Sequence, residues 1–369
     1  MTQVLHVMAS GARGGGAEHL LGLLPRLEGL EFACSAAVGT DGPLSDELAA
    51  CGIRTMPLDL MRSRLSLRGV FSLVQVLRRT HPQIVHCHGT RAAFFAALGR
   101  PWWPKSTRMV YTAHGLSTSK EMSRLRRLVF AAAEKQACGA ADRVISVSRE
   151  DLDEMRRRRW IPVERSSHIP NAVDTDRFRP LDQAKAREAL GIGVQESVMG
   201  TVARLTRGKA VCDVIASAAA LPDVQVVIVG DGELRGELER QAAPLGKRVR
   251  FLGSRRDVES ILPALDVFVL SSHWEAEGIA LLEAMSTSLA CIATATTGAI
   301  EVFGKPAAGV LVPIGDPVAL GAAIAALLGD PSRRRLLGQA ARATVMARSC
   351  DTMAKRTAAV YRACLSAVR

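Results

Sequence analysis

Two glutamates with seven residues between them form the segment of this sequence best suited to chemistry. Glu275 and Glu283 follow the apolar run Val267–Leu270, which is typical of a buried strand. An apolar stretch after Gly278 predicts a helix, with Glu283 in its second turn and Glu275 in the preceding loop. Free N–H groups at a helix start bind anions, and each carboxylate can accept two hydroxyl donors. Together these features indicate a nucleotide sugar; the alternative is two solvated glutamates beside an ordinary amphipathic helix.

Two cations lie at the end of an earlier predicted strand. Arg204 and Lys209, five positions apart, follow the apolar segment Ser197–Val202. Fixed cations at a strand end can hold a diphosphate and neutralise its charge as it leaves. Surface Arg/Lys pairs are common, so the hypothesis depends on their place after this strand and before Glu275.

A glycine-rich loop near the start of the chain has the form of a βα turn. It separates an apolar strand at 4–8 from an apolar helix at 17–27 and contains Gly15 and Gly16. Glycine lets a backbone approach a phosphate closely. The spacing matches neither the dinucleotide-binding fingerprint nor a P-loop, so the loop alone is a weak indication.

Histidines mark the ends of two further predicted strands, 84–88 and 110–113. His88 and His114 are each followed by glycine. Ligands bind at the carboxyl edge of open parallel sheets, so both imidazoles are expected at such an edge. We predict a functional role for His114, leave His88 open between a functional and a structural role, and expect His86 to point into the core.

Length and composition indicate a globular protein of two domains. The chain has 369 residues, of which 48% are hydrophobic and 4% aromatic. Strands and helices alternate along it, which predicts parallel sheets, and no repeat of solenoid length is visible. The net charge of +12 is concentrated before residue 174, where 24 Lys and Arg face 15 Asp and Glu. This excess indicates an anionic partner, such as a membrane surface, lipid phosphate or nucleic acid, or serves solubility alone.

The eight cysteines are scattered singly and show no metal-binding spacing. We therefore expect buried, reduced thiols and a cytoplasmic protein. We expect no secretory leader, and no apolar run reaches the roughly 18 residues needed to cross a bilayer. Any membrane contact would be peripheral, on the inner face of the cell membrane.

Two basic segments could provide such a contact. Residues Ser119–Ala132 predict a basic amphipathic helix, which can lie on an anionic membrane or be an ordinary surface helix. The cluster Arg156–Trp160 can bind phosphates or simply be solvated.

These motifs, in this order, resemble the GT4 family of retaining glycosyltransferases. The segment E-A-E-G-I-A-L-L-E-A-M-S at 275–286 resembles the family's Glu-x7-Glu motif, and A-R-L-T-R-G-K at 203–209 resembles its phosphate-binding loop. The first loop G-G-A-E at 15–18 and the linker I-P-N-A-V-D at 169–174 are also similar. The resemblance covers nearly the whole chain and is specific for the family, though not for a substrate.

The resemblance implies an α/β protein of the GT-B fold, with two Rossmann-like, doubly wound parallel-sheet domains facing a central cleft. Residues 1–172 would form the acceptor-binding domain and residues 173–350 the nucleotide-sugar donor-binding domain. A C-terminal helix at about 351–369 would cross back to the first domain.

The resemblance also implies a role for each motif residue. The cations would stabilise the departing diphosphate, Glu275 would hold the transferred sugar, Glu283 the ribose hydroxyls, and His114 a sugar hydroxyl. The predicted catalytic residues are thus His114, Arg204, Lys209 and Glu275. The predicted substrate-binding residues are Gly15, Gly16, Gly278, Ile279, Ala280, Glu283 and, near the base, Leu252.

The chain departs from the family pattern at several positions without losing a charged functional group. Glu277 replaces an aromatic residue, and this extra carboxylate is expected beside the donor sugar, where it would alter which hydroxyls are read. Alanine or serine replaces glycine at Ala276, Ala210 and Ser288, alanine replaces proline at 290, and threonine replaces glycine at 297.

The function implied is transfer of a hexose from a UDP- or GDP-sugar, with retention, to a lipid-linked or saccharide acceptor in bacterial cell-envelope or exopolysaccharide synthesis. We predict no metal and no cofactor; the sequence has Asp-x-Asp triplets at 151–153 and 174–176, away from the motifs at 203–209 and 275–286. The alternatives are a nucleotide-sugar epimerase of similar fold, and a non-catalytic membrane- or polysaccharide-binding protein. A nucleic-acid binder is a third, disfavoured by the scarcity of aromatic residues and of recognition motifs.

Overall fold

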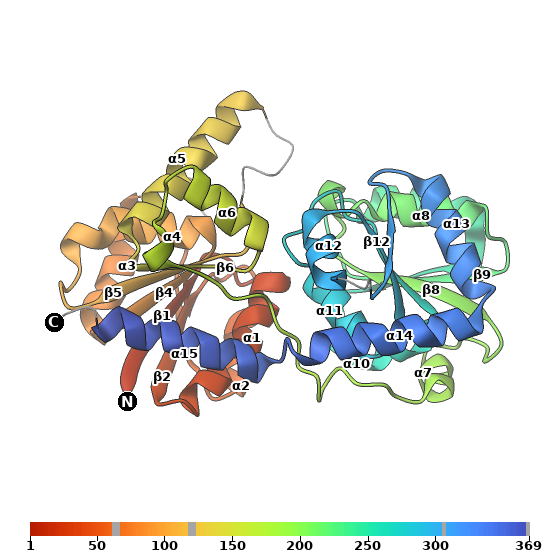
Figure 1. Ribbon diagram of the computed structural model, residues 1–369, viewed down its shortest axis with the longest axis horizontal. Coiled ribbons are helices and arrows are strands. Elements are labelled where there is room, and N and C mark those ends of the chain that lie inside the picture. The colour runs from red at the N-terminus through yellow and green to blue at the C-terminus, as the bar shows by residue number, and fades with distance from the viewer. Residues whose placement is uncertain (61–66, 117–122, 305–307, 367–369) are drawn as a thin grey trace. The chain divides into compact units, whose positions relative to one another are not determined.

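The computed structural model describes residues 1–60, 67–116, 123–304 and 308–366, and divides the chain into two compact units. Unit 1 comprises Met1–Ala172 together with Cys350–Arg369, and unit 2 comprises Val173–Ser349. The chain therefore passes from unit 1 to unit 2 and back again. Figure 1 shows both units as sheets covered by helices.

Unit 1 is built on a seven-stranded parallel sheet with the strand order β3-β2-β1-β4-β5-β6-β7. Residues of β1 alternate between its faces: Leu5 and Val7 join one apolar core, and Val4 and Met8 join the other. A strand buried on both faces is expected in a sheet with helices on both sides. The strands are β1 (Thr2–Met8), β2 (Phe32–Val38), β3 (Arg54–Pro57), β4 (Ile84–His88), β5 (Arg108–Ala113), β6 (Arg143–Ser146) and β7 (Ser166–His168).

Helices cover both faces of this sheet. One core contains residues of α3, α4, α5 and α6, and the other contains residues of α1, α2 and α15. The C-terminal α15 is thus part of the core of unit 1. The helices are α1 (Gly15–Glu28), α2 (Leu44–Ala50), α3 (Leu67–Thr80), α4 (Gly89–Gly99), α5 (Arg124–Ala140), α6 (Arg149–Arg157) and α15 (Cys350–Ser366).

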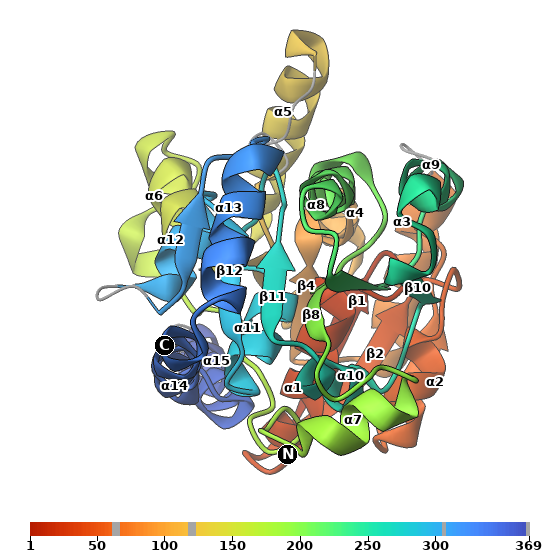
Figure 2. The same ribbon diagram turned by 90° about the vertical axis from the view of Figure 1, so that its right-hand side faces the viewer.

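Unit 2 repeats this plan with a six-stranded parallel sheet in the order β10-β9-β8-β11-β12-β13. Figure 2 shows this sheet and its flanking helices from the side. The strands are β8 (Ser197–Val202), β9 (Val224–Val229), β10 (Val249–Gly253), β11 (Val267–Leu270), β12 (Ala290–Thr294) and β13 (Val310–Val312). The helices are α7 (Gln183–Ala189), α8 (Val211–Ala219), α9 (Arg235–Ala242), α10 (Val258–Ile261), α11 (Ile279–Ser286), α12 (Thr297–Phe303), α13 (Pro317–Leu328) and α14 (Pro331–Met346).

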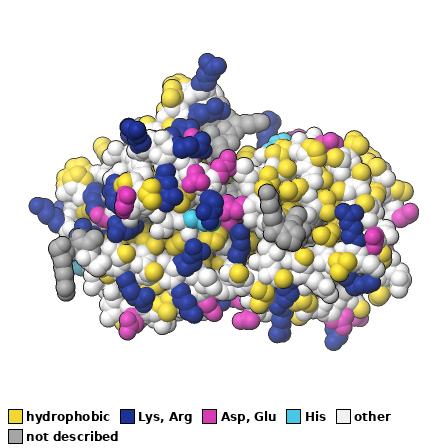
Figure 3. Space-filling view, viewed as in Figure 1, with side chains coloured by type: hydrophobic (Ala, Val, Ile, Leu, Met, Phe, Trp, Pro, Cys, Tyr) yellow, Lys and Arg dark blue, Asp and Glu magenta, His cyan; other side chains and the backbone are white. Residues whose placement is uncertain are grey.

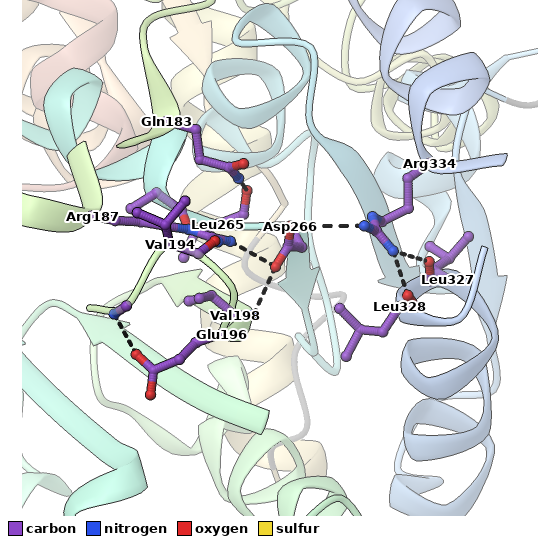
Figure 4. A network of polar contacts seen from close by, with 12 residues as sticks. Gln183, Arg187, Val194, Glu196, Val198, Leu265, Asp266, Leu327, Leu328 and Arg334 are labelled. Atoms are coloured by element: carbon purple, nitrogen blue, oxygen red, sulfur yellow. Dashed lines mark hydrogen bonds and ion pairs between the residues drawn. The ribbon is translucent and has the colours of Figure 1, made fainter. Parts of the chain in front are cut away.

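A buried polar network fastens the central strands of unit 2 where β8 and β11 begin (Figure 4). The carboxylate of Asp266 accepts hydrogen bonds from the Val198 amide and from the Arg187 guanidinium, each at 2.8 Å. Arg187 is 3% exposed and also donates to the carbonyl of Ala264. Arg334 of α14 lies 3.9 Å from the same carboxylate. This edge is held rigid, and the opposite edge is left to the loops that follow β8 and β11.

Most predicted elements are present, with small shifts at their ends. The prediction for 119–132 is partly wrong, because the helix begins at Arg124 and continues to Ala140; residues 119–122 lie outside the described residues. Strand β7 and the helices α4, α6, α8 and α12 were not predicted. All eight cysteines are free, but Cys51 and Cys212 are exposed, so the expectation of buried thiols holds for six.

Candidate active site

Both sheets contain a point where the strand order reverses. In unit 1, β1 lies between β2 and β4, and in unit 2, β8 lies between β9 and β11. Loops that leave the carboxyl ends of such neighbouring strands diverge and leave room for a ligand. The loops after β8 and β11 carry Arg204, Lys209 and Glu275, so the fold brings these predicted residues to one edge of unit 2.

An ion pair joins the two loops. The ammonium group of Lys209 contacts the carboxylate of Glu275, and both side chains are partly buried, 23% and 11% exposed. The Ser271 hydroxyl donates to the Lys209 carbonyl at 2.9 Å, and the amide of His273 donates to the carbonyl of Gly208 at 3.0 Å. These three contacts fix a cation and a carboxylate side by side.

Helix α11 begins directly after this loop. Its N-cap, Gly278, has φ 71°, a left-handed conformation that glycine adopts without strain. The carbonyl of Gly278 accepts from the amides of Leu281 and Leu282, so those of Ile279 and Ala280 belong to the orphan donors of the first turn. Glu283, one turn further on, is 7% exposed.

Helix α12 supports the loop that carries Glu275. The amide of Gly298 donates to the Glu275 carbonyl at 3.2 Å. A Cβ atom at position 298 would lie 2.5 Å from backbone atoms of Glu275 and Ala276, far inside van der Waals contact. Only glycine therefore fits at this position without moving the Glu275 loop.

The remaining predicted residues of unit 2 differ in their surroundings. The side chain of Arg204 is exposed and has no hydrogen-bond or ion-pair partner among the described residues. Leu252 lies near the end of β10 and packs, partly buried, against the core of unit 2. An exposed cation and a partly buried apolar side chain are both compatible with the predicted roles, which no contact in the structure tests.

The expectation for Glu277 is wrong. Its carboxylate is fully buried and pairs at 2.6 Å with Arg348, whose guanidinium also donates to the carbonyl of Glu301. The carbonyl of Arg348 accepts from the amide of Val173, the first residue of unit 2. Glu277 therefore ties the Glu275 loop to the chain segments where unit 2 begins and ends, instead of facing a sugar.

The glycine loop of unit 1 leads into α1, as predicted, and α1 begins at Gly15. The carbonyl of Gly14 accepts from the amides of Ala17 and Glu18. The amides of Gly15 and Gly16 are thus among the orphan donors of the first turn. A Cβ atom at position 16 would lie 2.9 Å from the Met8 methyl group, so glycine permits close packing of α1 on β1.

Five imidazoles of unit 1 form a group that the sequence analysis missed in part. His88 lies between His6 and His114, with nitrogen separations of 3.0 Å to Nδ1 of His6 and 3.3 Å to Nε2 of His114. His19 of α1 stacks edge-on against His114, with ring centroids 4.7 Å apart. As predicted, His86 is buried; the hydroxyls of Thr112 and Tyr361 contact its two nitrogens. His6 and His19 were not singled out.

Burial keeps this group neutral. It lowers the pKa of His6 to about 3 and that of His19 to about 4. Burial, and then the neighbouring histidines, hold the pKa values of His86, His88 and His114 well below 6.5. Each ring therefore offers one N–H donor and one lone pair at neutral pH. Nε2 of His6 has no hydrogen-bond partner among the described residues.

The arginine cluster at 156–159 largely serves local structure. Arg156 donates to the hydroxyl of Ser166 at 2.9 Å, and Arg157 and Arg158 both pair with Glu154. These contacts within the protein were not predicted for the cluster, which was expected to bind phosphates or to be solvated. Among the described residues, no helix combines the length and the apolar composition that crossing a membrane would need.

Comparison with known proteins agrees with this architecture. The family model described as glycosyl transferases group 1 matches residues 182–344, and the model described as Glycosyltransferase Family 4 matches residues 13–177. One falls largely within unit 2 and the other largely within unit 1.

Individual relatives cover most of the chain. A UDP-Gal:alpha-D-GlcNAc-diphosphoundecaprenol alpha-1,3-galactosyltransferase of Escherichia coli is 30% identical over 73% of each chain. A 2-deoxystreptamine N-acetyl-D-glucosaminyltransferase of Streptomyces fradiae is 30% identical over 76% of this chain and 73% of its own. The crystal structure of Anabaena HepE with UDP-glucose matches 98% of this chain and 100% of its own, with a TM-score of 0.87 and 23% identity. The chain belongs to the GT4-type glycosyltransferases, and it has their GT-B fold.

Proposed function

We propose that this glycosyltransferase transfers a hexose, with retention of configuration, from a UDP- or GDP-sugar to a lipid-linked or saccharide acceptor. Unit 2 binds the donor and unit 1 binds the acceptor. The reaction uses no divalent metal, because protein cations take over the neutralisation of the diphosphate. It serves bacterial cell-envelope or exopolysaccharide synthesis.

The contact between Lys209 and Glu275 carries this proposal. It holds a cation and a carboxylate together at the ligand-binding edge of unit 2. In the proposed reaction Lys209 and Arg204 bind the diphosphate and stabilise its charge as it departs. Glu275 accepts sugar hydroxyl donors and supports the positive charge that develops at the anomeric carbon.

Helix α11 supplies the second half of the donor site. The amides of Ile279 and Ala280 donate to a phosphate oxygen, and Glu283 holds the ribose hydroxyls. The Anabaena HepE complex with UDP-glucose supports a nucleotide-sugar donor for this fold. His114 positions a hydroxyl of the transferred sugar; its ring is neutral, so it can donate or accept.

We further propose that the first turns of α5 hold the protein on an anionic membrane. Leu125, Leu128 and Val129 are 72%, 68% and 62% exposed, and Arg124, Arg126 and Arg127 beside them are also exposed. Figure 3 shows hydrophobic and basic side chains together where this end of α5 projects from unit 1. Such a surface fits lipid tails and anionic head groups at once. The diphosphoundecaprenol acceptor named for the Escherichia coli relative supports a membrane-bound acceptor.

A donor panel tests the proposal directly. Thermal unfolding would be measured with UDP-, GDP- and ADP-sugars, since a donor that binds only the folded protein raises the midpoint by mass action. The donor that binds would then be incubated with acceptor, and the anomeric configuration of the product determined by NMR. We expect one UDP- or GDP-sugar to stabilise the protein and the product to keep the donor's configuration. An inverted product, or an epimerised nucleotide sugar without transfer, contradicts the proposal.

A further inference from the structure

The five neighbouring histidines of unit 1 contain two trios whose nitrogens are close enough to share one ion. In each trio the candidate ligand atoms lie within 4.8 Å of one another. One trio is His6, His86 and His88, and the other is His19, His88 and His114. His88 belongs to both, so the surroundings of the other members decide between them.

The first trio is poorly placed to take up an ion. Both nitrogens of His86 are engaged by the hydroxyls of Tyr361 and Thr112, at 2.5 and 2.7 Å. His6 and His86 are fully buried, and His88 is 3% exposed. To bind an ion through either nitrogen, His86 would have to give up one of these buried hydrogen bonds. The second trio includes the half-buried His114, which gives access to water.

One nitrogen separation in the second trio fits a tetrahedral zinc site. Nδ1 of His88 lies 3.3 Å from Nε2 of His114. Two nitrogens bonded to one tetrahedral Zn²⁺ at about 2.0–2.1 Å are separated by about 3.3–3.4 Å. The ring of His19 completes the group, 4.7 Å from His114 and 5.5 Å from His88 between centroids.

Neighbouring groups determine which ring nitrogen carries the proton and which keeps the lone pair that a metal ion needs. Nδ1 of His19 lies 3.1 Å from the side-chain oxygen of Asn171, which can only accept, so Nδ1 carries the proton and Nε2 keeps its lone pair. Nε2 of His88 lies 3.0 Å from Nδ1 of His6, and donation in that direction leaves Nδ1 of His88 free for an ion. Zinc-binding histidines are commonly oriented by such outer hydrogen bonds.

We propose that His19, His88 and His114 bind one Zn²⁺ ion, with a water molecule as the fourth ligand. Imidazole nitrogens select zinc and similar transition metals over Mg²⁺, and three histidines plus water is a known zinc coordination. The bound ion occupies the lone pair of His114 and displaces a sugar hydroxyl from it. That last consequence rests on the proposed function of His114, whereas binding of the ion does not.

The test uses the full chain, freed of metal, in which the exposed Cys51 and Cys212 are replaced by serine to remove competing thiols. Zn²⁺ binding would be followed by competition with a chromophoric chelator, and Co²⁺ would report geometry through its visible absorption. We expect one equivalent of Zn²⁺, intense tetrahedral Co²⁺ bands and no response to Mg²⁺. His19→Gln removes a ligand and abolishes both signals, and Asn171→Leu, which keeps all three ligands, weakens binding by about 10- to 100-fold.

His273→Gln provides the matched control, because His273 lies in unit 2 beside Asp213, 3.7 Å away, and outside the proposed site. This variant should bind Zn²⁺ as tightly as its parent. Circular dichroism of each variant separates loss of a ligand from loss of the fold. Stoichiometric binding that persists in a folded His19→Gln variant, an octahedral Co²⁺ spectrum, or no uptake by the parent overturns the proposal. Each of these results leaves the donor panel unaffected.

Discussion

The ammonium group of Lys209 contacts the carboxylate of Glu275, although the two residues are 66 positions apart in the chain. Neither loop forms this cation–carboxylate pair by itself. The turn after β8 brings the cation, and the loop between β11 and α11 brings the carboxylate. Removal of either partner therefore changes both the charge and the geometry of the proposed donor site.

Lys209→Ala should reduce turnover by orders of magnitude, of the size seen when one group that stabilises a developing anion is removed, about 100- to 1,000-fold. The chain should still fold, but with a lowered thermal midpoint, because the carboxylate of Glu275, 11% exposed, loses its cation. Steady-state kinetics and the thermal midpoint measure the two effects. Lys185→Ala, at an exposed position of α7, is the control and should leave turnover unchanged. Near-wild-type turnover of Lys209→Ala would contradict the proposed role.

Gly298→Ala should lower turnover without touching any charged group. The added Cβ meets the backbone of Glu275 and Ala276 at 2.5 Å, so the loop must shift. A displacement of this size at a reacting centre costs about 100-fold in rate. Gly139→Ala in α5 is the matched control, because nothing lies within 4 Å of its new Cβ and alanine favours a helix. Equal kinetics for the two variants would show that the loop position is unimportant.

The buried pair of Glu277 and Arg348 predicts a strongly non-additive response. Glu277→Ala leaves a guanidinium that is 17% exposed without its carboxylate, which should destabilise unit 2 by about 3–5 kcal/mol. The double variant Glu277→Leu/Arg348→Met should recover most of this loss, because no unpaired charge remains. Hydrogen exchange of β8–β12 in a urea series measures the stability of unit 2. A loss of stability in the double variant equal to the sum of the losses in the two single variants would argue against a coupled pair.

The histidine group predicts that acid destabilises unit 1. The folded chain keeps these imidazoles neutral, whereas the unfolded chain protonates them near pH 6.5. The unfolded state therefore binds more protons than the folded state below pH 6.5. The free energy of unfolding that is present above that pH is lost as the pH falls toward 4. The loss amounts to up to about 1.4 kcal/mol per histidine and pH unit. Hydrogen exchange of unit 1 would be compared at about pH 7.5 and 5.5 with a chelator present. Unit 2, which holds one of the eight histidines, is the internal control. If the stability of unit 1 against hydrogen exchange is the same at both pH values, the prediction is wrong.

The exposed end of α5 predicts salt-dependent membrane binding. Replacing Arg124, Arg126 and Arg127 by glutamine should weaken sedimentation with phosphatidylglycerol vesicles by about 3 kcal/mol, or over 100-fold, and should remove the salt dependence. Leu125→Ser/Leu128→Ser should weaken binding at every salt concentration, since apolar burial is not screened. The paired exposed arginines of α14, 333 and 335, provide glutamine controls in unit 2. Binding to neutral vesicles, or equal loss in the α14 controls, would refute a site on α5.

The contact between Lys209 and Glu275 could be predicted because short motifs fix their local geometry. A strand that ends in a turn with Lys209, and a helix that starts after Gly278, bring their side chains to the same sheet edge in any parallel α/β unit. Two departures from the family pattern are informative here. Ala210 and Ser288 replace glycine, yet both keep left-handed backbones, with φ of 46° and 63°. A backbone conformation that favours glycine is thus kept without glycine, at a strain of about 1–2 kcal/mol per position.

The histidine group and the Glu277 pair could not be predicted, because both depend on contacts between distant segments. His6 meets His86 only through the register of β1 against β4, in which the two residues are direct partners. Glu277 was expected beside the donor sugar, but its carboxylate turns inward to an arginine 71 positions later. Sequence spacing within a loop does not reveal which way a side chain points when its partner lies on another element.

Helix α15 completes the core of unit 1 with residues that are synthesised after the whole of unit 2. Tyr361 packs fully buried in that core and contacts His86, and Met353 and Ala354 fill the same face of the sheet. During synthesis, the face of the unit 1 sheet that α15 covers therefore stays uncovered in the first 172 residues until the whole of unit 2 has been made. The nascent chain is expected to need chaperone protection during that interval, and truncation before residue 350 would leave an aggregation-prone protein.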